Sequence, residues 1–150
     1  MTSDDNPRVV VPPPLIFAGL VASGLAVNRT AIALGPLQVI GAILGVTGVG
    51  LVASALGLFR KQNTRPEPWQ PSNALVTHGV YRMTRNPMYL GMAMLSLGVA
   101  LLFSSFAGSL LAMVAAVIID RTVIPREEAY LVRRFAQDYI SYAGRVRRWL

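Results

Sequence analysis

Residues 36–59 read PLQVIGAILGVTGVGLVASALGLF, a run of 24 residues without a charged side chain. The hydrocarbon core of a bilayer is about 30 Å thick, and about 20 helical residues cross it. The run is therefore long enough to span a membrane as a helix. Its small residues include Gly41 and Gly45, whose spacing of four lets membrane helices approach closely. We expect a transmembrane helix whose glycine strip leaves room for a neighbouring helix or a flat ligand.

Working outward from this run, three further apolar stretches give predicted spans at about 12–27, 88–103 and 106–122. The last two are short and are separated by Ser104 and Ser105, which predicts a tight helical hairpin. Charged residues make up 14% of the chain and hydrophobic residues 53%, whereas a soluble domain has about 25% charged residues. We expect an all-α integral membrane protein with one domain, residues 1–150, and four transmembrane helices. Asp4 and Asp5 argue against a cleavable signal peptide.

The charges that remain are unevenly placed. There are 14 basic and 7 acidic residues, a net charge of +7. The predicted loop 60–87 and the region after residue 120 hold all the basic residues except Arg8 and Arg29. Cytoplasmic loops of membrane proteins are enriched in Lys and Arg, so we expect both termini in the cytoplasm of a multi-pass protein, in a bacterial inner membrane. Because topology explains the positive charge, nucleic-acid binding is not needed to account for it.

The last part of the chain predicts an amphipathic helix over residues 126–148, beginning after Pro125. Its apolar stripe consists of Tyr130, Leu131, Phe135, Tyr139, Tyr142 and Val146. Two interpretations are open: the helix lies on the anionic membrane surface, or it folds back and caps a site. The acid pair Glu127 and Glu128 has two interpretations as well. The acids stabilise the helix start, or they contact different parts of one ligand.

The loop 60–87 also permits two interpretations. Pro66, Pro68 and Pro71 indicate an extended, stiffened chain, Gly79 marks a turn, and Pro87 suits the first turn of the third span. The loop is then a polar lid over a pocket, or a basic connector anchored by interfacial aromatic residues. Zero cysteines and one histidine argue against a zinc site, and the first three spans lack the buried acid of a proton-coupled transporter.

The order of motifs resembles a known family. Residues 74–82, ALVTHGVYR, and 85–91, RNPMYLG, are similar to the L-V-T-x-G-x-Y…R-H-P-x-Y-x-G signature of isoprenylcysteine carboxyl methyltransferases and their bacterial relatives. Residues 126–146 resemble the C-terminal E-E…Y-x-x-R-V block of that family. The related phosphatidylethanolamine N-methyltransferases share N-P-M-Y, the acid pair and a G-x-G in the preceding helix. Asn86 stands where histidine is commoner, which leaves the methyl acceptor open.

The resemblance implies binding of S-adenosylmethionine (SAM) at the cytoplasmic membrane face, without metal. It implies a cofactor site that combines the glycines of the second span, the loop and the acid pair: Gly48, Gly50, Val76, His78, Gly79, Tyr81, Arg85, Asn86, Pro87, Tyr89, Gly91, Glu127 and Glu128. Arg85, Glu127, Glu128 and Arg145 are the candidate catalytic residues.

The implied activity is methyl transfer to a lipophilic acceptor, a membrane lipid or prenylated molecule, with carboxylate O-methylation of an isoprenylcysteine-like substrate expected. Methyl transfer from a sulfonium depends on alignment and exclusion of water, and a carboxylate acceptor is already deprotonated at neutral pH. Such a site needs no histidine or cysteine. The alternatives are phospholipid amine N-methylation, for which Glu127 or Glu128 would serve as base, a reductase of the NADPH-dependent type, or a non-catalytic membrane or transport protein.

Overall fold

The computed structural model describes residues 11–30, 35–62 and 74–150, and within these residues every regular element is helical. The elements are α1 (Pro13–Val27), α2 (Pro36–Lys61), the 3-10 helix η1 (Gly79–Arg82), α3 (Pro87–Leu102), α4 (Phe106–Ile118), the π-helical turn η2 (Ile119–Val123) and α5 (Ile124–Ala143). The predicted all-α class is confirmed. Pro66, Pro68 and Pro71, on which the expectation of an extended loop rested, lie outside the described residues.

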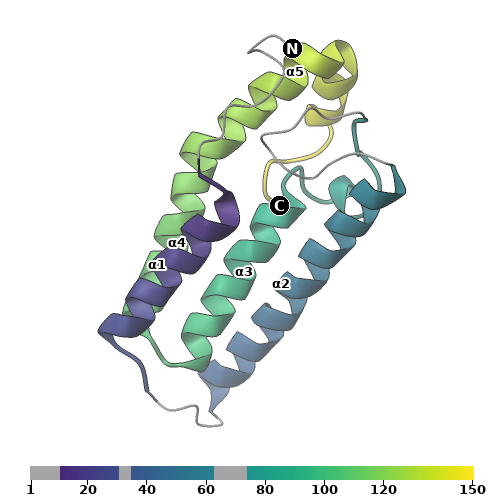
Figure 1. Ribbon diagram of the computed structural model, residues 1–150. Coiled ribbons are helices and arrows are strands. Elements are labelled where there is room, and N and C mark those ends of the chain that lie inside the picture. The colour runs from purple at the N-terminus through teal and green to yellow at the C-terminus, as the bar shows by residue number, and fades with distance from the viewer. Residues whose placement is uncertain (1–10, 31–34, 63–73) are drawn as a thin grey trace.

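Helices α1 to α4 lie side by side, and α5 continues from α4 beyond the end of the bundle (Figure 1). Helix α3 is central, because it packs against α1, α2 and α4. The arrangement brings the start of α3, the end of α2 and the start of α5 to the same end of the bundle. The hairpin turn between α3 and α4 lies at the opposite end.

Glycines allow α2 and α3 to pack with their backbones in close approach. A Cβ atom added at Gly48 would lie 2.5 Å from the carbonyl oxygen of Gly91, and one at Gly41 would lie 2.8 Å from that of Gly98. On each helix the two glycines are seven residues apart, about two turns, so they share one face. The glycine strip of α2 is therefore filled at these positions by a neighbouring helix, as in small-residue contacts between membrane helices.

The predicted hairpin is present, with its turn at residues 103–105. Ser105 caps α4, since its Oγ accepts a hydrogen bond from the Gly108 amide at 2.9 Å. The same hydroxyl lies 3.2 Å from the carbonyl oxygen of Gly24 and donates to it. Gly24 and Gly108 also meet directly, because a Cβ atom at Gly24 would lie 2.5 Å from the Gly108 Cα. These contacts fix the C-terminal end of α1 against the start of α4.

Large apolar side chains remain exposed along α2 and α4. They include Leu37, Val39, Ile40, Ile43, Val46 and Val49 on α2, and Phe106, Leu110, Met113 and Val117 on α4. Two helical segments, Pro36–Lys61 and Phe106–Ala143, are long and apolar enough to cross a membrane, and only 17% and 33% of their most apolar parts are buried. A core helix of a soluble protein would be mostly buried. Exposed apolar surface on this scale is typical of a membrane interaction.

The C-terminal helix differs from the predicted range 126–148. It starts at Ile124 as a continuation of α4, and it ends at Ala143. The π-helical turn η2 widens the backbone just before Pro125, whose ring would otherwise clash with the preceding turn. Residues 144–150, here called the C-terminal tail, leave the helix and return to the start of α3 (Figure 1).

Candidate functional site

The charged end of the bundle begins with the turn before α3. Pro87 is buried in the first turn of this helix, as predicted. Thr84 is only 1% exposed, and its Oγ1 accepts a hydrogen bond from the Asn86 amide at 3.1 Å. The same hydroxyl donates to the carbonyl oxygen of Arg148 at 3.0 Å, as does the Asn86 side-chain amide, also at 3.0 Å. The Arg85 amide donates to the carbonyl oxygen of Arg147 at 2.9 Å. The turn and the C-terminal tail are thus joined through backbone and side chain.

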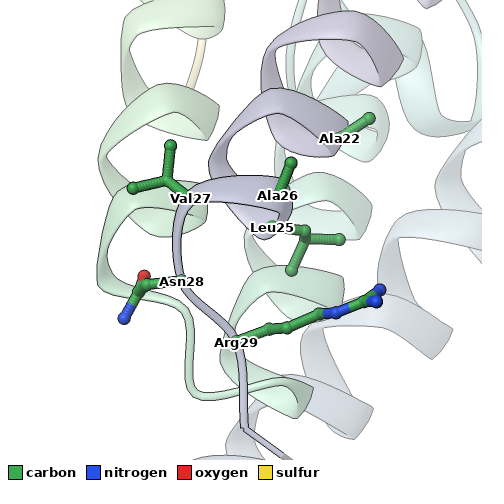
Figure 2. Close-up of a pocket in the computed structure, with 6 residues that line it drawn as sticks. All are labelled: Ala22, Leu25, Ala26, Val27, Asn28 and Arg29. Carbon is green, nitrogen blue, oxygen red and sulfur yellow. The ribbon is translucent and has the colours of Figure 1, made fainter.

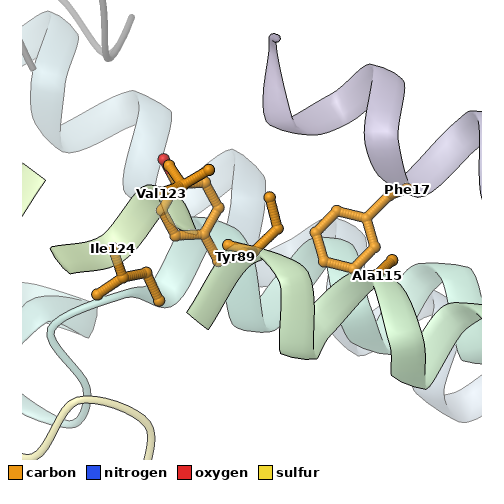
Figure 3. Close-up of a cluster of buried hydrophobic side chains, with 6 residues drawn as sticks. Phe17, Tyr89, Ala115, Val123 and Ile124 are labelled. Atoms are coloured by element: carbon orange, nitrogen blue, oxygen red, sulfur yellow. The ribbon is translucent and has the colours of Figure 1, made fainter. Parts of the chain in front are cut away.

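Tyr89 and Glu127 form a buried hydrogen-bonded pair next to this turn. The Tyr89 hydroxyl donates a hydrogen bond of 2.5 Å to Glu127 Oε1. The Tyr89 ring belongs to a buried cluster that also contains Phe17, Val123 and Ile124 (Figure 3). Burial raises the pKa of the Glu127 carboxyl to about 7, the Tyr89 hydrogen bond opposes this rise, and the neighbouring charge of Glu128 adds to it. Among the described residues, no ion pair to Glu127 is present.

Glu128 lies between two arginines. Its Oε1 is 3.3 Å from Arg85 Nη1, and its Oε2 is 2.6 Å from Arg148 Nη2. Arg148 Nε donates to Glu128 Oε1 at 3.3 Å, so the contact is bidentate, the geometry that favours arginine over lysine. Hydrogen bonding to Glu128 raises the pKa of the Arg148 guanidinium. Glu128 is therefore electrostatically compensated, unlike the adjacent Glu127.

Asp120 joins the same network from the π-helical turn. Its Oδ1 lies 3.4 Å from Arg148 Nη1 and accepts a hydrogen bond of 2.9 Å from the indole nitrogen of Trp149. π-helical turns inside helices occur frequently at functional sites. The turn here places Asp120 within hydrogen-bonding distance of the Arg148 and Trp149 side chains.

A second buried cluster joins α2, η1 and α5 at the same end of the bundle. It contains Ala55 from α2, Val76 and Tyr81 from the loop and η1, and Tyr139 and Tyr142 from α5. The Tyr142 hydroxyl donates to the Tyr81 carbonyl oxygen at 2.7 Å, which ties α5 to η1. Gly79, predicted to mark a turn, has φ of +61°, a conformation that glycine adopts without strain.

The structure brings five of the sequence-predicted site residues together at this end: Arg85, Asn86, Tyr89, Glu127 and Glu128. Pro87, Tyr81 and Val76 are buried at this end of the bundle, and the Tyr81 hydroxyl interacts electrostatically with Glu127. Within the part of the chain that the structure describes, the buried Arg85 Nε atom has no hydrogen-bond partner.

The remaining predicted residues lie elsewhere. Gly48 and Gly91 face each other in the α2–α3 contact, and Gly50 is exposed with no side-chain neighbour within 4 Å of an added Cβ. His78 is exposed, with Nδ1 3.4 Å from the Gln62 side-chain nitrogen. Arg145 is exposed and donates from Nε to the Ser141 carbonyl oxygen at 3.2 Å, one turn back along its own chain. None of these three contacts places a residue beside the acid pair.

Thr84, Asp120, Arg148 and Trp149 belong to the network but are absent from the predicted site. An available signal was the pattern Arg-Arg-Trp at 147–149, which sets the chain's second tryptophan beside two cations at the end of an amphipathic segment. That pattern alone does not say which of the two arginines turns inward.

A cavity of about 680 Å³ lies at the other end of the bundle, lined by Ala22, Leu25, Ala26, Val27, Asn28 and Arg29 (Figure 2). Apart from Asn28 and Arg29, its lining is aliphatic. Both of these residues are exposed. The acids, arginines and tyrosines gather around Glu128 instead, and we therefore place the candidate site there.

Fold and site together define an all-helical protein with apolar, outward-facing helices and a charged site at one end. The sequence model of the Phospholipid methyltransferase family matches residues 37–138. This is more than half of the chain, and the protein belongs to that family. The family resemblance seen in the sequence motifs is confirmed. Membership and the two long apolar helices together indicate a membrane protein.

Individual relatives cover about half of the chain. It is 35% identical over 81 residues to protein-S-isoprenylcysteine O-methyltransferase A of Arabidopsis thaliana, covering 52% of this chain and 40% of that protein. It is 36% identical over 72 residues to protein-S-isoprenylcysteine O-methyltransferase of Schizosaccharomyces pombe, covering 48% of this chain and 30% of that protein. The matched region thus spans less than half the length of these relatives. No solved structure matches the protein.

Proposed function

We propose that the protein is a SAM-dependent methyltransferase that acts on a lipophilic acceptor at the cytoplasmic membrane face, with a carboxylate of an isoprenylcysteine-like molecule as the methyl acceptor. The single observation that carries the proposal is the uncompensated acid Glu127, held by Tyr89 beside the turn that bears the family motif. Family membership and the relatives named as isoprenylcysteine O-methyltransferases support the reaction type.

The residues present fit the charges of SAM. The cofactor has two cationic groups, a sulfonium and an ammonium, and one carboxylate. Glu127 is a buried acid without a described cation partner, and a cationic group beside it would favour its charged form. Charge-assisted hydrogen bonds to such groups are the stronger ones. In this proposal Glu127 faces a cationic group, and the wall is formed by the 84–86 turn and the buried tyrosines.

When bound, SAM would supply an electrophilic methyl group, and a carboxylate acceptor, already deprotonated at neutral pH, would need no base from the protein. The protein needs to align the acceptor and exclude water. Arg85 is the side chain we assign to the acceptor carboxylate. The exposed apolar faces of α2 and α4 would let a lipophilic acceptor arrive through the bilayer.

Phospholipid amine N-methylation is a second candidate, favoured by a specific observation. An amine acceptor has to lose a proton during transfer, and a general base acts best when its pKa is near the working pH. Burial raises the pKa of Glu127 to about 7, which suits that role. The family match by itself is compatible with both acceptors.

The test uses purified protein in detergent with methyl-labelled SAM. Binding is measured first, and then transfer to three acceptors: a prenylcysteine analogue, the same analogue with its carboxyl amidated, and phosphatidylethanolamine. We expect label on the free carboxylate and none on the amide. Label on phosphatidylethanolamine alone would select the amine reaction, and nicotinamide-dependent turnover without SAM binding would contradict methyl transfer altogether.

A matched pair of variants tests the assigned acid. Glu127→Gln removes the charge but keeps the shape, and we expect SAM affinity to fall by about tenfold or more, as for loss of a charge-assisted contact. Asp138→Asn makes the same change at an exposed acid on α5 and is expected to bind SAM like the unmodified protein. Equal binding by both variants would show that Glu127 does not contact the cofactor.

A further inference from the structure

The C-terminal tail is fastened to the site by its backbone. The carbonyl oxygens of Arg147 and Arg148 accept three hydrogen bonds, all from residues 84–86: the Arg85 amide at 2.9 Å, and the Thr84 hydroxyl and Asn86 side-chain amide at 3.0 Å each. The donors belong to the turn that carries two of the predicted cofactor residues. The position of this turn therefore depends on the position of the tail.

The side chains of the tail attach to a second part of the molecule. Arg148 contacts both oxygens of Glu128 and one oxygen of Asp120, and the Trp149 indole donates to the same Asp120 oxygen. Trp149 also packs against the buried cluster around Phe17 and Tyr89. The tail thus links the turn before α3 to the junction of α4 and α5, two segments that carry the proposed site.

The two acids of the pair, Glu127 and Glu128, differ in their ion-pair partners. Glu128 is paired with Arg85 and Arg148, and Asp120 is paired with Arg148 and with the exposed Arg121. Among the described residues, Glu127 forms no ion pair. It is therefore the acid of the pair that remains available to a cationic group of SAM.

We propose that Arg148 and Trp149 are positioning residues of the cofactor site: through Glu128 and Asp120 they hold Arg85 and Asn86 in place, so that Glu127 is the acid that contacts the cofactor. The inference rests on the proposed function, since it names how that same site is assembled. It assigns Glu128 to anchoring the tail rather than to contact with SAM.

In the opposite role, Arg148 would compete with the cofactor for the acids. That role is disfavoured because it requires release of the tail, which breaks several contacts. The nearly buried Thr84 hydroxyl and the Asp120 and Glu128 carboxylates would lose partners, and the Trp149 ring would leave its apolar cluster. Buried polar groups without partners are costly. The tail is held in this arrangement by all of these contacts together.

The test has one readout that does not involve SAM. The chain has two tryptophans, so in a Trp69→Phe background the fluorescence comes from Trp149 alone. Arg148→Gln should shift this emission to longer wavelength and increase its quenching by acrylamide. Arg134→Gln, which makes the same change of charge at an exposed arginine of α5, should alter neither.

The second readout is SAM affinity with the same variants. We expect Arg148→Gln to weaken SAM binding by about tenfold or more, because misplacement of supporting groups by 1 Å can cost up to about 100-fold. Arg148→Lys keeps the charge without the bidentate contact and should restore part of the affinity. Trp149→Phe removes the indole donor to Asp120 and shortens the ring that packs on the buried cluster. If Arg148→Gln does not fold, this variant gives the SAM-affinity test alone, because it lacks the fluorescent side chain.

The outcomes separate the two proposals. Release of Trp149 with unchanged SAM affinity overturns the positioning role, and release with tighter binding shows that the tail competes with the cofactor and overturns it as well. Unchanged Trp149 fluorescence in Arg148→Gln overturns the attachment itself. If the unmodified protein binds no SAM, the proposed function fails and takes the positioning role with it. That result is distinct from a loss confined to the Arg148 and Trp149 variants.

Discussion

Glu127 shows how a single side chain can make the stability of this protein depend on pH. Its pKa is raised from 4.5 to about 7, first by burial, in a part of α5 that follows the apolar residues of α4 and η2. The folded protein therefore retains a proton that the unfolded chain loses above pH 4.5, and unfolding releases it. Stability must then fall as the pH rises from about 5 to above 7, by on the order of 2–3 kcal/mol.

We expect this slope to disappear in Glu127→Gln, because glutamine is neutral at every pH and can still accept the Tyr89 hydrogen bond. The measurement is the apparent unfolding midpoint in detergent without ligand, from pH 5 to pH 8. The adjacent Glu128→Gln change is the control, since Glu128 is paired with Arg85 and Arg148. That variant should be less stable at neutral pH, whereas Glu127→Gln should be more stable there. Parallel pH profiles for Glu127→Gln and the unmodified protein would contradict the buried-acid explanation.

At the scale of elements, the contact between α2 and α3 depends on glycine at particular positions of one helix. A Cβ at Gly48 would approach the Gly91 carbonyl oxygen and the Leu95 amide nitrogen to 2.5 and 2.7 Å, whereas a Cβ at Gly50 has nothing within 4 Å. We expect Gly48→Ala to destabilise the protein by about 1–3 kcal/mol through overpacking. Gly50→Ala should be neutral or stabilising, because alanine is the better helix former. Thermal unfolding of both variants measures the difference, and equal midpoints would argue against the close approach of the two helices.

Much of this element structure could be predicted from the sequence, because the length and composition of apolar runs determine where helices form. The hairpin followed from two apolar stretches around Ser104 and Ser105. The partner of the glycine strip was not predicted, although Gly91 and Gly98 repeat the seven-residue spacing of Gly41 and Gly48. Such a spacing shows that two faces are compatible, but not that they meet.

The sequence motifs supply candidate residues near one another in the chain, whereas the contacts made by the C-terminal tail depend on tertiary structure. Arg145 is a candidate through its place in the Y-x-x-R-V block; in the structure it follows the end of α5 at Ala143, and its Nε donates to the Ser141 carbonyl oxygen. The carbonyl oxygens of Arg147 and Arg148 bind residues more than 60 positions earlier in the chain. Such long-range backbone contacts leave no periodic pattern in the sequence, so Arg148 could not be separated from its basic neighbours.

For the molecule as a whole, the distribution of charge along the helix bundle predicts an orientation in the membrane. Among the described residues, Arg29 is the basic residue at the end that holds the α3–α4 turn, and the other arginines and Lys61 lie toward the end with the candidate site. Lys and Arg are enriched on the cytoplasmic side. The charged site, with its proposed access to SAM, should therefore face the cytoplasm.

The absence of cysteine from the sequence allows this orientation to be tested without background. Arg29→Cys and Lys61→Cys each introduce one thiol at an exposed position and remove one positive charge, at the two ends of the bundle. In intact cells, a membrane-impermeant maleimide should label Arg29→Cys but not Lys61→Cys, and permeabilisation should expose the second thiol. Labelling of Lys61→Cys in intact cells would reverse the orientation. It would also remove cytoplasmic SAM from the reach of Glu127, because the start of α5 and the end of α2 lie at the same end of the bundle.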